Sequence, residues 1–315
     1  MNQAPCVSCV MPVRNGRAFI QEAVTSILSQ DYQDLELLVI DDGSSDWNYR
    51  ELEQQDSRVR VIRLEGRGVS FARNTGIAAA RGRYIAFLDA DDYWFPGKLG
   101  AQVRYFENHP EAGVVFGGFV RWYPDTARHF APPATLAHDC SQTTKANPER
   151  SGWLYSRLLQ GLLVGMNTAV VRRELLERIG GFDTARRLGE DYDLWLRASQ
   201  VTELHALADT VALYRIHSAS AMHRPEERNG LAELLVSAKE RWGLGNAQGP
   251  SLQPAEFACR LGQVHFDHGY THYWHGSARV AQREFTAAFL AGFRRGRSAA
   301  YVALALLKAL GQRQR

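Results

Sequence analysis

The chain has 315 residues, of which 45% are hydrophobic and 23% charged, and its formal net charge at pH 7 is +3. This composition predicts a globular protein with one large core, or one core plus a small helical appendage. The four cysteines are too few and too scattered for a disulfide framework. We find neither a charged-then-apolar leader nor an apolar run of about 18 residues, so we expect a cytoplasmic protein with no membrane span. No nucleic-acid partner is expected.

Strand and helix patterns alternate over the first hundred residues. Apolar runs predict strands, at 7–11, 35–40, 59–62 and 84–88. Periodic segments between them predict helices, at 19–30, 47–56 and 70–80. Strict alternation is typical of an α/β fold with a doubly wound, mostly parallel sheet flanked by helices. Ligands of such sheets bind at the carboxyl ends of the strands.

The alternation becomes less regular after residue 98. Further helices are expected up to residue 109 and at 153–163, 173–179 and 191–199, and further strands at 113–119 and 167–171. The intervening segment 123–148 contains Pro, Asp and Thr, and we interpret it as a substrate-facing loop. From about Gly230 the chain appears entirely helical. We therefore predict two parts, residues 1–228 and a C-terminal helical region at 229–315.

Three carboxylates, Asp89, Asp91 and Asp92, directly follow the strand predicted at 84–88. Carboxylates clustered at the end of a buried strand repel one another unless a cation or several hydrogen-bond donors compensate. Carboxylate oxygens without neighbouring Cys or His indicate Mg²⁺ or Mn²⁺. The alternative is that Asp89 and Asp91 are solvated loop residues and Asp92 caps a helix that begins near Pro96.

A second carboxylate pair, Asp41 and Asp42, ends the strand predicted at 35–40. Gly43 allows a close backbone approach there, and carboxylates in this position can accept hydrogen bonds from a base or a ribose. The chain lacks a complete G-x-G-x-x-G loop and a Walker loop. A nucleotide held by carboxylates and a metal is therefore favoured over a dehydrogenase or an ATPase.

Five motifs occur in one order along the chain, namely Met11-Pro12-Val13-Arg14-Asn15, Asp41-Asp42-Gly43-Ser44, Ala72-Arg73-Asn74-Thr75-Gly76, Leu88-Asp89-Ala90-Asp91-Asp92 and Gly189-Glu190-Asp191-Tyr192-Asp193. Together they resemble the inverting family 2 glycosyltransferases, which have the A-type nucleotide-diphospho-sugar transferase fold. The resemblance is dense over residues 7–120 and resumes at 180–195. It implies the A-type fold for residues 1–228, followed by the helical region.

The resemblance also implies a donor site. Pro12 and Asn15 would lie on the first nucleotide loop, Asp42 would bind the base with Asp41 beside it, and Asp89 would contact the ribose. Asp91 would bind a divalent ion, Mn²⁺ or Mg²⁺, that bridges the diphosphate.

Five further residues have implied roles near the reacting groups. Asp191 resembles the catalytic base, with Glu190 as the alternative base. Arg215 and His217 resemble residues that touch the diphosphate or the metal. For Arg73, a contact with the diphosphate and a structural pair with a core carboxylate are equally open.

The implied activity is transfer of a sugar from a nucleoside-diphosphate donor, expected to be a UDP-sugar, to a hydroxyl of a glycan or lipid-linked glycan during bacterial surface polysaccharide synthesis. Two alternatives stay open. A sugar nucleotidyltransferase would need a glycine-rich activating loop, of which Arg14-Asn15-Gly16-Arg17 is a faint version. A non-catalytic scaffold would not need Asp42, Asp89, Asp91 and Asp191 together.

The C-terminal region carries three further features. Four histidines recur at spacings of three, four and three residues, namely His265, His268, His272 and His275. Their aromatic neighbours favour a structural or interface helix over a metal site. Segment 218–230 is interpreted as a crossing to the helices or a lid. From residue 285 onward the chain has basic but no acidic residues, and 299–310 is apolar nearly all round. This end is expected to pack as a helix, or to contact a partner or the inner face of the cell membrane.

Overall fold

The structure is a computed structural model and describes residues 4–143, 145–217 and 226–311. Two compact units are found, one within residues 1–154 and 163–217, the other within 155–162 and 218–315. Each unit is described by itself. The domain division at residue 228 stays a prediction, and most of the segment interpreted as a crossing or lid, residues 218–225, lies outside the described residues.

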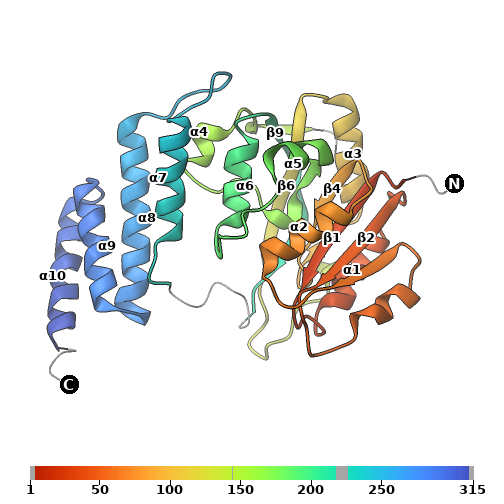
Figure 1. Cartoon of the computed structure of the whole chain (residues 1–315), viewed down its shortest axis with the longest axis horizontal. Coiled ribbons are helices and arrows are strands. Elements are labelled where there is room, and N and C mark those ends of the chain that lie inside the picture. The colour runs from red at the N-terminus through yellow and green to blue at the C-terminus, as the bar shows by residue number, and fades with distance from the viewer. Residues whose placement is uncertain (1–3, 144, 218–225, 312–315) are drawn as a thin grey trace. The chain divides into compact units, whose positions relative to one another are not determined.

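The first unit is built around a sheet that has nine strands among the described residues (Figure 1). The strand order is β3-β2-β1-β4-β8-β6-β9-β5, and β7 pairs with β9. The strands are β1 Val7–Val13, β2 Leu35–Asp41, β3 Val59–Arg63, β4 Tyr84–Phe87, β5 Tyr93–Trp94, β6 Ala112–Trp122, β7 Ala146–Gly152, β8 Val170–Arg172 and β9 Glu203–Arg215. The α-helices of this unit are α1 Ile20–Leu28, α2 Val69–Ala79, α3 Lys98–Asn108, α5 Arg173–Ile179 and α6 Glu190–Ala198.

Strand directions determine which residues meet at each edge of the sheet. β1 pairs in parallel with both β2 and β4, and β2 pairs in parallel with β3. β8 is antiparallel to β4 and to β6, while β6 and β9 are parallel to each other. Strands β1, β2, β4, β6 and β9 therefore begin at one edge and end at the other. The mixed α/β sheet with flanking helices confirms the predicted fold class.

The central strands have the continuous apolar sequences expected of a sheet that is covered on both faces. All seven residues of β1 and all seven of β2 are buried. One charged exception is Glu36 in β2, which accepts a hydrogen bond from the Ser8 hydroxyl at 2.6 Å and pairs with Arg81 at 2.8 Å. The buried carboxylate is thus compensated, as a charge in a core must be.

Several predicted elements differ from the structure. The helix predicted at 47–56 is a 3₁₀ helix, Tyr49–Gln54, and the helix predicted at 153–163 is only the single turn α4, Tyr155–Leu158. Gly161 lies in that segment, and glycine is a poor helix former. The strand predicted at 167–171 overlaps a 3₁₀ turn, Met166–Thr168, before β8 begins.

Three strands, β5, β7 and β9, were not predicted. β9 contains Glu, Leu and Ala, which favour helices in isolation, and it forms a strand because β5, β6 and β7 pair with it. β7 begins inside the segment interpreted as a loop, so only part of 123–148 is irregular, with a 3₁₀ turn at Pro133–Thr135. Strand pairing over long sequence distances overrides local propensity in β7 and β9.

The second unit is helical, as predicted from Gly230 onward. Its helices are α4, α7 Gly230–Trp242, α8 Pro254–His275, α9 Ala278–Leu290 and α10 Arg295–Gly311. Figure 1 shows α7, α8, α9 and α10 in succession, and neighbouring helices of this series contact each other. Their core contains an aromatic pair and small residues, namely Phe266, Phe285, Ala281, Ala288 and Ala305.

The histidines of α8 contact protein groups. His265 Nδ1 lies 2.8 Å from Glu284 Oε2, and His272 Nε2 lies 2.8 Å from the carbonyl oxygen of Glu226. The Asn229 amide also donates to Glu284. These contacts connect α8 with α9 and with the segment before α7, and they favour the structural interpretation of this histidine-rich helix.

Helix α10 is apolar on two sides. Tyr301 and Val302 pack against the helical core. Several leucines are exposed on the same helix, namely Leu304, Leu306, Leu307 and Leu310. Among the described residues, no helix is both long enough and apolar enough to cross a membrane.

Candidate active site

Asp41 and Asp42 lie at the edge of the sheet where β2 ends, and both are buried. Asp41 accepts hydrogen bonds from the Ser44 backbone N–H and from Arg63, each at 2.8 Å. These bonds close the turn that follows β2 and compensate the charge of Asp41.

The Asp42 carboxylate connects this turn with the loop that precedes α2. It accepts hydrogen bonds from the backbone N–H groups of Arg67 at 2.7 Å and Gly68 at 2.8 Å. At Gly43 the backbone has a φ of +77°, and an added Cβ would lie 2.9 Å from the Gly66 nitrogen. Glycine is therefore required here, because both the conformation and the space exclude a side chain.

Pro12 and Asn15 place the end of β1 against this turn. Pro12 pairs with Ile40 within the sheet. Asn15 has a φ of +54°, its backbone N–H donates to the Ser44 hydroxyl at 2.9 Å, and its side-chain oxygen accepts from the Ser45 N–H at 2.9 Å. The first and second predicted nucleotide motifs are thus bonded to each other.

Arg73 joins two motifs that are far apart in the sequence. This buried guanidinium on α2 donates to Asp89 Oδ1 and to Glu190 Oε1, each at 2.8 Å. Burial alone would lower the pKa of Arg73, but the charges of Asp89 and Glu190 outweigh burial and raise it. Of the two interpretations left open, the structure shows the pairing with carboxylates.

The residue after Arg73 determines where the segment before α6 lies. The Asn74 amide donates to the Phe182 carbonyl, and its oxygen accepts from the Phe182 N–H, each at 2.8 Å. At Gly181 a Cβ would lie 2.6 Å from the Asn74 oxygen. Phe182 in turn places its ring 5.4 Å from the Arg73 guanidinium carbon. Helix α2 therefore contacts both Asp89, which follows β4, and Glu190, which begins α6.

Glu190 and Asp191 begin α6, but their environments differ. Glu190 is paired with Arg73, whereas the contact of Asp191 is a hydrogen bond that Oδ1 accepts from the adjacent Tyr192 N–H at 2.7 Å. Burial, followed by the negative charge of Glu190, raises the pKa of Asp191 to about 6, although Arg73 opposes this shift. A carboxylate with such a pKa suits proton abstraction near neutral pH.

Asp91 and His217 supply a carboxylate and an imidazole that face each other. His217 Nε2 lies 2.9 Å from Asp91 Oδ2, and the two side chains are 17% and 35% exposed. Asp89, on the other side of Ala90, is 32% exposed. Carboxylates with an imidazole are donors that Mn²⁺ accepts, so the residues present fit a divalent ion.

Asp92 does not cap a helix, contrary to the alternative drawn from the sequence. Helix α3 begins after Gly97 without a side-chain cap. Asp92 is buried and accepts hydrogen bonds from the Asn167 amide at 2.8 Å and the Arg215 backbone N–H at 2.9 Å. Burial, together with the charges of Asp91 and Asp89, raises the pKa of Asp92.

Arg215 is held by protein groups and is 2% exposed. Its guanidinium donates to the Asp91 carbonyl oxygen and to Glu22, each at 2.6 Å, and lies 3.8 Å from the centre of the Trp122 ring. A direct contact between Arg215 and a diphosphate stays a prediction. The observed contacts position the backbone that carries Asp91.

Sequence reasoning missed the partners Glu22, Asn74 and Asn167. Asn74 lies in the motif at residues 72–76, and its amide side chain next to Arg73 could have indicated its role. Glu22 and Asn167 carry no local signal, because their partners lie 193 and 75 residues away along the chain.

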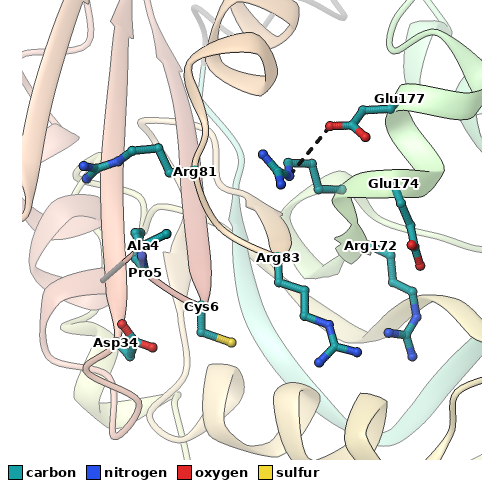
Figure 2. A pocket seen from close by; sticks show the side chains of 10 residues that line it. Ala4, Pro5, Cys6, Asp34, Arg81, Arg83, Arg172, Glu174 and Glu177 are labelled. Carbon is teal, nitrogen blue, oxygen red and sulfur yellow. Dashed lines mark ion pairs between the residues drawn. The ribbon is translucent and has the colours of Figure 1, made fainter. Parts of the chain in front are cut away.

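The opposite edge of the sheet contains a cavity of about 440 Å³ where β1 and β4 begin (Figure 2). Arginines and carboxylates line it, and Arg173 is paired with Glu177 as the dashed line shows. Arg81, which also lines the cavity, is paired with Glu36, which does not line it. The cavity lies away from the strand ends that carry the predicted site.

Solved structures of two transferases resemble the chain. The TarS 1–349 structure of S. aureus in complex with UDP-GlcNAc has a TM-score of 0.63 at 18% identity, covering 98% of this chain and 91% of that one. The mannosyltransferase PcManGT of Pyrobaculum calidifontis, in complex with GDP-Man and Mn²⁺, has a TM-score of 0.57 at 21% identity, covering 98% and 88%. At these identities the likeness concerns the fold, which is that of the A-type transferases.

Sequence relatives are named glycosyltransferases. An uncharacterized glycosyltransferase of Rickettsia felis is 28% identical over 240 residues, which are 74% of this chain but only 38% of that protein. The Escherichia coli protein named UDP-Glc:alpha-D-GlcNAc-diphosphoundecaprenol beta-1,3-glucosyltransferase WfgD is 31% identical over 204 residues, 64% of this chain and 72% of WfgD. The sequence pattern of Glycosyl transferase family 2 matches residues 8–180, more than half of the chain, which therefore belongs to that family.

Proposed function

We propose that this protein is an inverting, metal-dependent glycosyltransferase. It moves a sugar from a nucleoside-diphosphate donor, a UDP-sugar, onto a hydroxyl of a glycan or lipid-linked glycan in bacterial surface polysaccharide synthesis. The observation that carries the proposal is that Arg73 pairs with two carboxylates, Asp89 and Glu190. Burial raises the pKa of Asp191 to about 6, and Asp89 and Asp91 are partly exposed.

The donor half of the reaction takes place where β2 and β4 end. Pro12 and Asn15 shape the first loop, Asp42 binds the base with Asp41 beside it, and Asp89 contacts the ribose. This assignment is supported by the bonds that unite the β1 and β2 turns, and by the binding of UDP-GlcNAc by TarS, which has the same fold. The choice of uracil as the base is supported by the similarity to WfgD and TarS, whose names or titles contain UDP.

The transfer itself is a single displacement. The acceptor hydroxyl oxygen forms a bond with the anomeric carbon while the bond from that carbon to the diphosphate oxygen breaks. The nucleoside diphosphate leaves with the electron pair, and the hydroxyl proton goes to Asp191. Glu190 is a weaker candidate for the base because its carboxylate already accepts from Arg73. One displacement inverts the anomeric centre without a covalent sugar–enzyme intermediate.

Asp91 and His217 are the residues that would hold a divalent ion. Such an ion, when bound, supplies positive charge that stabilises the departing diphosphate. Mn²⁺ is favoured over Mg²⁺ because an imidazole stands among the donors. The hydrogen bond between Asp91 and His217 would be replaced by bonds from both side chains to the metal.

A lipid-linked acceptor would be reached at a membrane surface. The exposed Leu307 and Leu310 of α10 and the exposed arginines Arg294, Arg295 and Arg297 provide apolar and cationic groups in one helical unit. Such a combination favours peripheral binding to anionic lipid. Sedimentation with anionic vesicles should fall for Leu307→Asp and stay unchanged for the control Val201→Asp. Equal sedimentation of both variants would refute this contact.

The activity is tested by product release from UDP-, GDP-, CDP- and dTDP-sugars with a lipid-linked glycan acceptor. The wild type should release the nucleoside diphosphate, and Asp191→Asn should lower kcat by about 10²- to 10⁴-fold while donor binding is retained. Asp193→Asn is the matched control, because Asp193 lies on the same helix and pairs with Arg197. It should keep most of the turnover.

Each alternative predicts a different product. Release of pyrophosphate from a nucleoside triphosphate and a sugar phosphate would support a nucleotidyltransferase and contradict our proposal. If no donor is turned over and Asp191→Asn behaves like Asp193→Asn in every assay, the scaffold alternative is favoured instead.

A further inference from the structure

A second group of metal-ligating side chains lies at the edge of the sheet opposite the candidate active site. His109 and Glu111 lie in the turn between α3 and β6, and His205 lies near the start of β9. Ten residues of β9 separate His205 from Arg215, a distance of about 33 Å along a strand. This group is therefore remote from the ion expected at Asp91.

The three side chains converge closely enough to share one ion. A ligand atom from each of His109, Glu111 and His205 lies within 4.8 Å of the other two. Ligand atoms around a tetrahedral ion at about 2.0–2.1 Å are themselves about 3.4 Å apart, so small rotations suffice. His109 Nδ1 already lies 2.9 Å from Glu111 Oε1. Two imidazoles with a carboxylate form a donor set that zinc prefers.

Neighbouring residues hold the ligands as metal sites usually require. The Tyr105 hydroxyl lies 2.9 Å from His205 Nδ1, so the nitrogen that would bind a metal is His205 Nε2, which lies beside Glu203. Tyr105 also stacks on His109 with ring centroids 4.0 Å apart. The Arg172 side chain contacts the His109 carbonyl oxygen at 3.3 Å, so it holds the turn rather than the imidazole.

Charge also suits a divalent cation. Glu203 Oε2 lies 2.9 Å from His205 Nε2, so Glu111 and Glu203 together bring two negative charges to the group. His109 directly follows α3 as its C-cap residue, and the carboxyl end of a helix attracts cations. Without an ion, the group consists of two separate histidine–glutamate pairs.

We propose that His109, Glu111 and His205 bind a zinc ion, with Glu203 balancing its charge. The ion joins the turn between α3 and β6 to the start of β9 and stabilises the pairing of these two long strands. This site is structural and is independent of sugar transfer.

The test uses full-length protein with the substitution Asp91→Asn, which removes the carboxylate expected to bind the other ion. After treatment with EDTA, the protein is titrated with zinc in competition with a fluorescent zinc chelator. We expect one tightly bound zinc per chain, lost in His109→Ala and in Glu111→Ala, both at exposed side chains. The control His129→Ala changes another exposed histidine and should retain the zinc.

A further variant separates ligand positioning from a general loss of stability. Tyr105→Phe removes only the hydroxyl next to His205, and it should weaken zinc binding about 10- to 100-fold while circular dichroism stays unchanged. No tight zinc in the Asp91→Asn protein would overturn the proposal. Equal zinc binding by His109→Ala, Glu111→Ala and His129→Ala would also overturn it, whether or not the protein transfers sugars.

Discussion

Arg73 and Lys98 are both buried basic residues, but their pKa values shift in opposite directions. Arg73 has two carboxylate partners, and its pKa is raised. Lys98 donates to the neutral Gln102 side chain at 2.7 Å and lies 4.0 Å from the Trp94 ring centre. Burial lowers the pKa of Lys98 to about 7, although the thiols of Cys9 and Cys140 oppose the shift. Arg73 therefore serves the site, whereas Lys98 affects stability.

The pKa of Lys98 predicts a pH-dependent stability. Below pH 7 the lysine is charged in both states, and the folded state carries the full cost of burying the charge. Between pH 7 and the ordinary value of 10.5, the unfolded chain binds a proton that the folded chain does not, so stability rises with pH. From pH 7 to pH 9 the wild type should gain about 2 to 3 kcal/mol relative to Lys98→Met.

Urea unfolding at the two pH values measures this difference. The comparison with Lys98→Met cancels the titration of other groups. Lys239→Met, at an exposed lysine, is the control and should show no such difference from the wild type. The explanation would be wrong if the wild type and Lys98→Met had parallel stability curves between pH 7 and pH 9.

The pKa of Asp191 predicts the acidic limb of the reaction. A general base acts only when it is deprotonated, so kcat/KM should be level above about pH 6 and fall tenfold per pH unit below it. The measurement is the pH profile of kcat/KM with the preferred donor, with Asp193→Asn as a control that keeps the same limb. A half-maximal point near pH 4, typical of an unperturbed carboxylate, would contradict the role of Asp191.

At the scale of elements, helix α2 connects the two halves of the candidate site. Arg73 contacts Asp89 and Glu190, and Asn74 holds Phe182. Two adjacent residues of one helix thereby determine how α6 lies relative to the end of β4.

We predict that Asn74→Ala lowers both stability and turnover. The change leaves the Phe182 N–H and carbonyl group without partners, which should cost about 1 to 3 kcal/mol. Because the segment before α6 loses its attachment, kcat should fall more than donor affinity. The control is Thr75→Ala, since the Thr75 hydroxyl donates only within its own helix. Unchanged kcat in a folded Asn74→Ala protein would show that α2 does not position Asp191.

The sequence predicted the elements whose signals are local. Strands β1, β2 and β4 are mainly apolar runs, and the carboxylates that follow β2 and β4 could be placed at one edge because parallel strands end together. β9 could not be predicted, because its pairing with β6 joins segments about 90 residues apart, and local pairing preferences are weak. Likewise, the sequence could name Arg73 as an important residue but could not show that it bonds Glu190, 117 residues away.

At the scale of the whole molecule, the sheet offers a different chemistry at each edge. Carboxylates that fit a nucleotide and its metal lie where β2 and β4 end, while histidine–glutamate pairs that fit zinc lie just before β6 and at the start of β9. The parallel course of these strands separates the two groups by the length of the sheet. A metal effect on activity and a metal effect on stability should therefore respond to different substitutions.

The central claim is a metal-dependent donor site at the carboxyl edge of the sheet. The most direct measurement is a thermal-shift screen of UDP, GDP, CDP, dTDP and their common sugars, with and without Mn²⁺, on the wild type, Asp91→Asn and the control His129→Ala. We predict that UDP or a UDP-sugar with Mn²⁺ raises the Tm of the wild type and the control, but not that of Asp91→Asn. No rise with any nucleotide, or an equal rise in Asp91→Asn, would contradict the account.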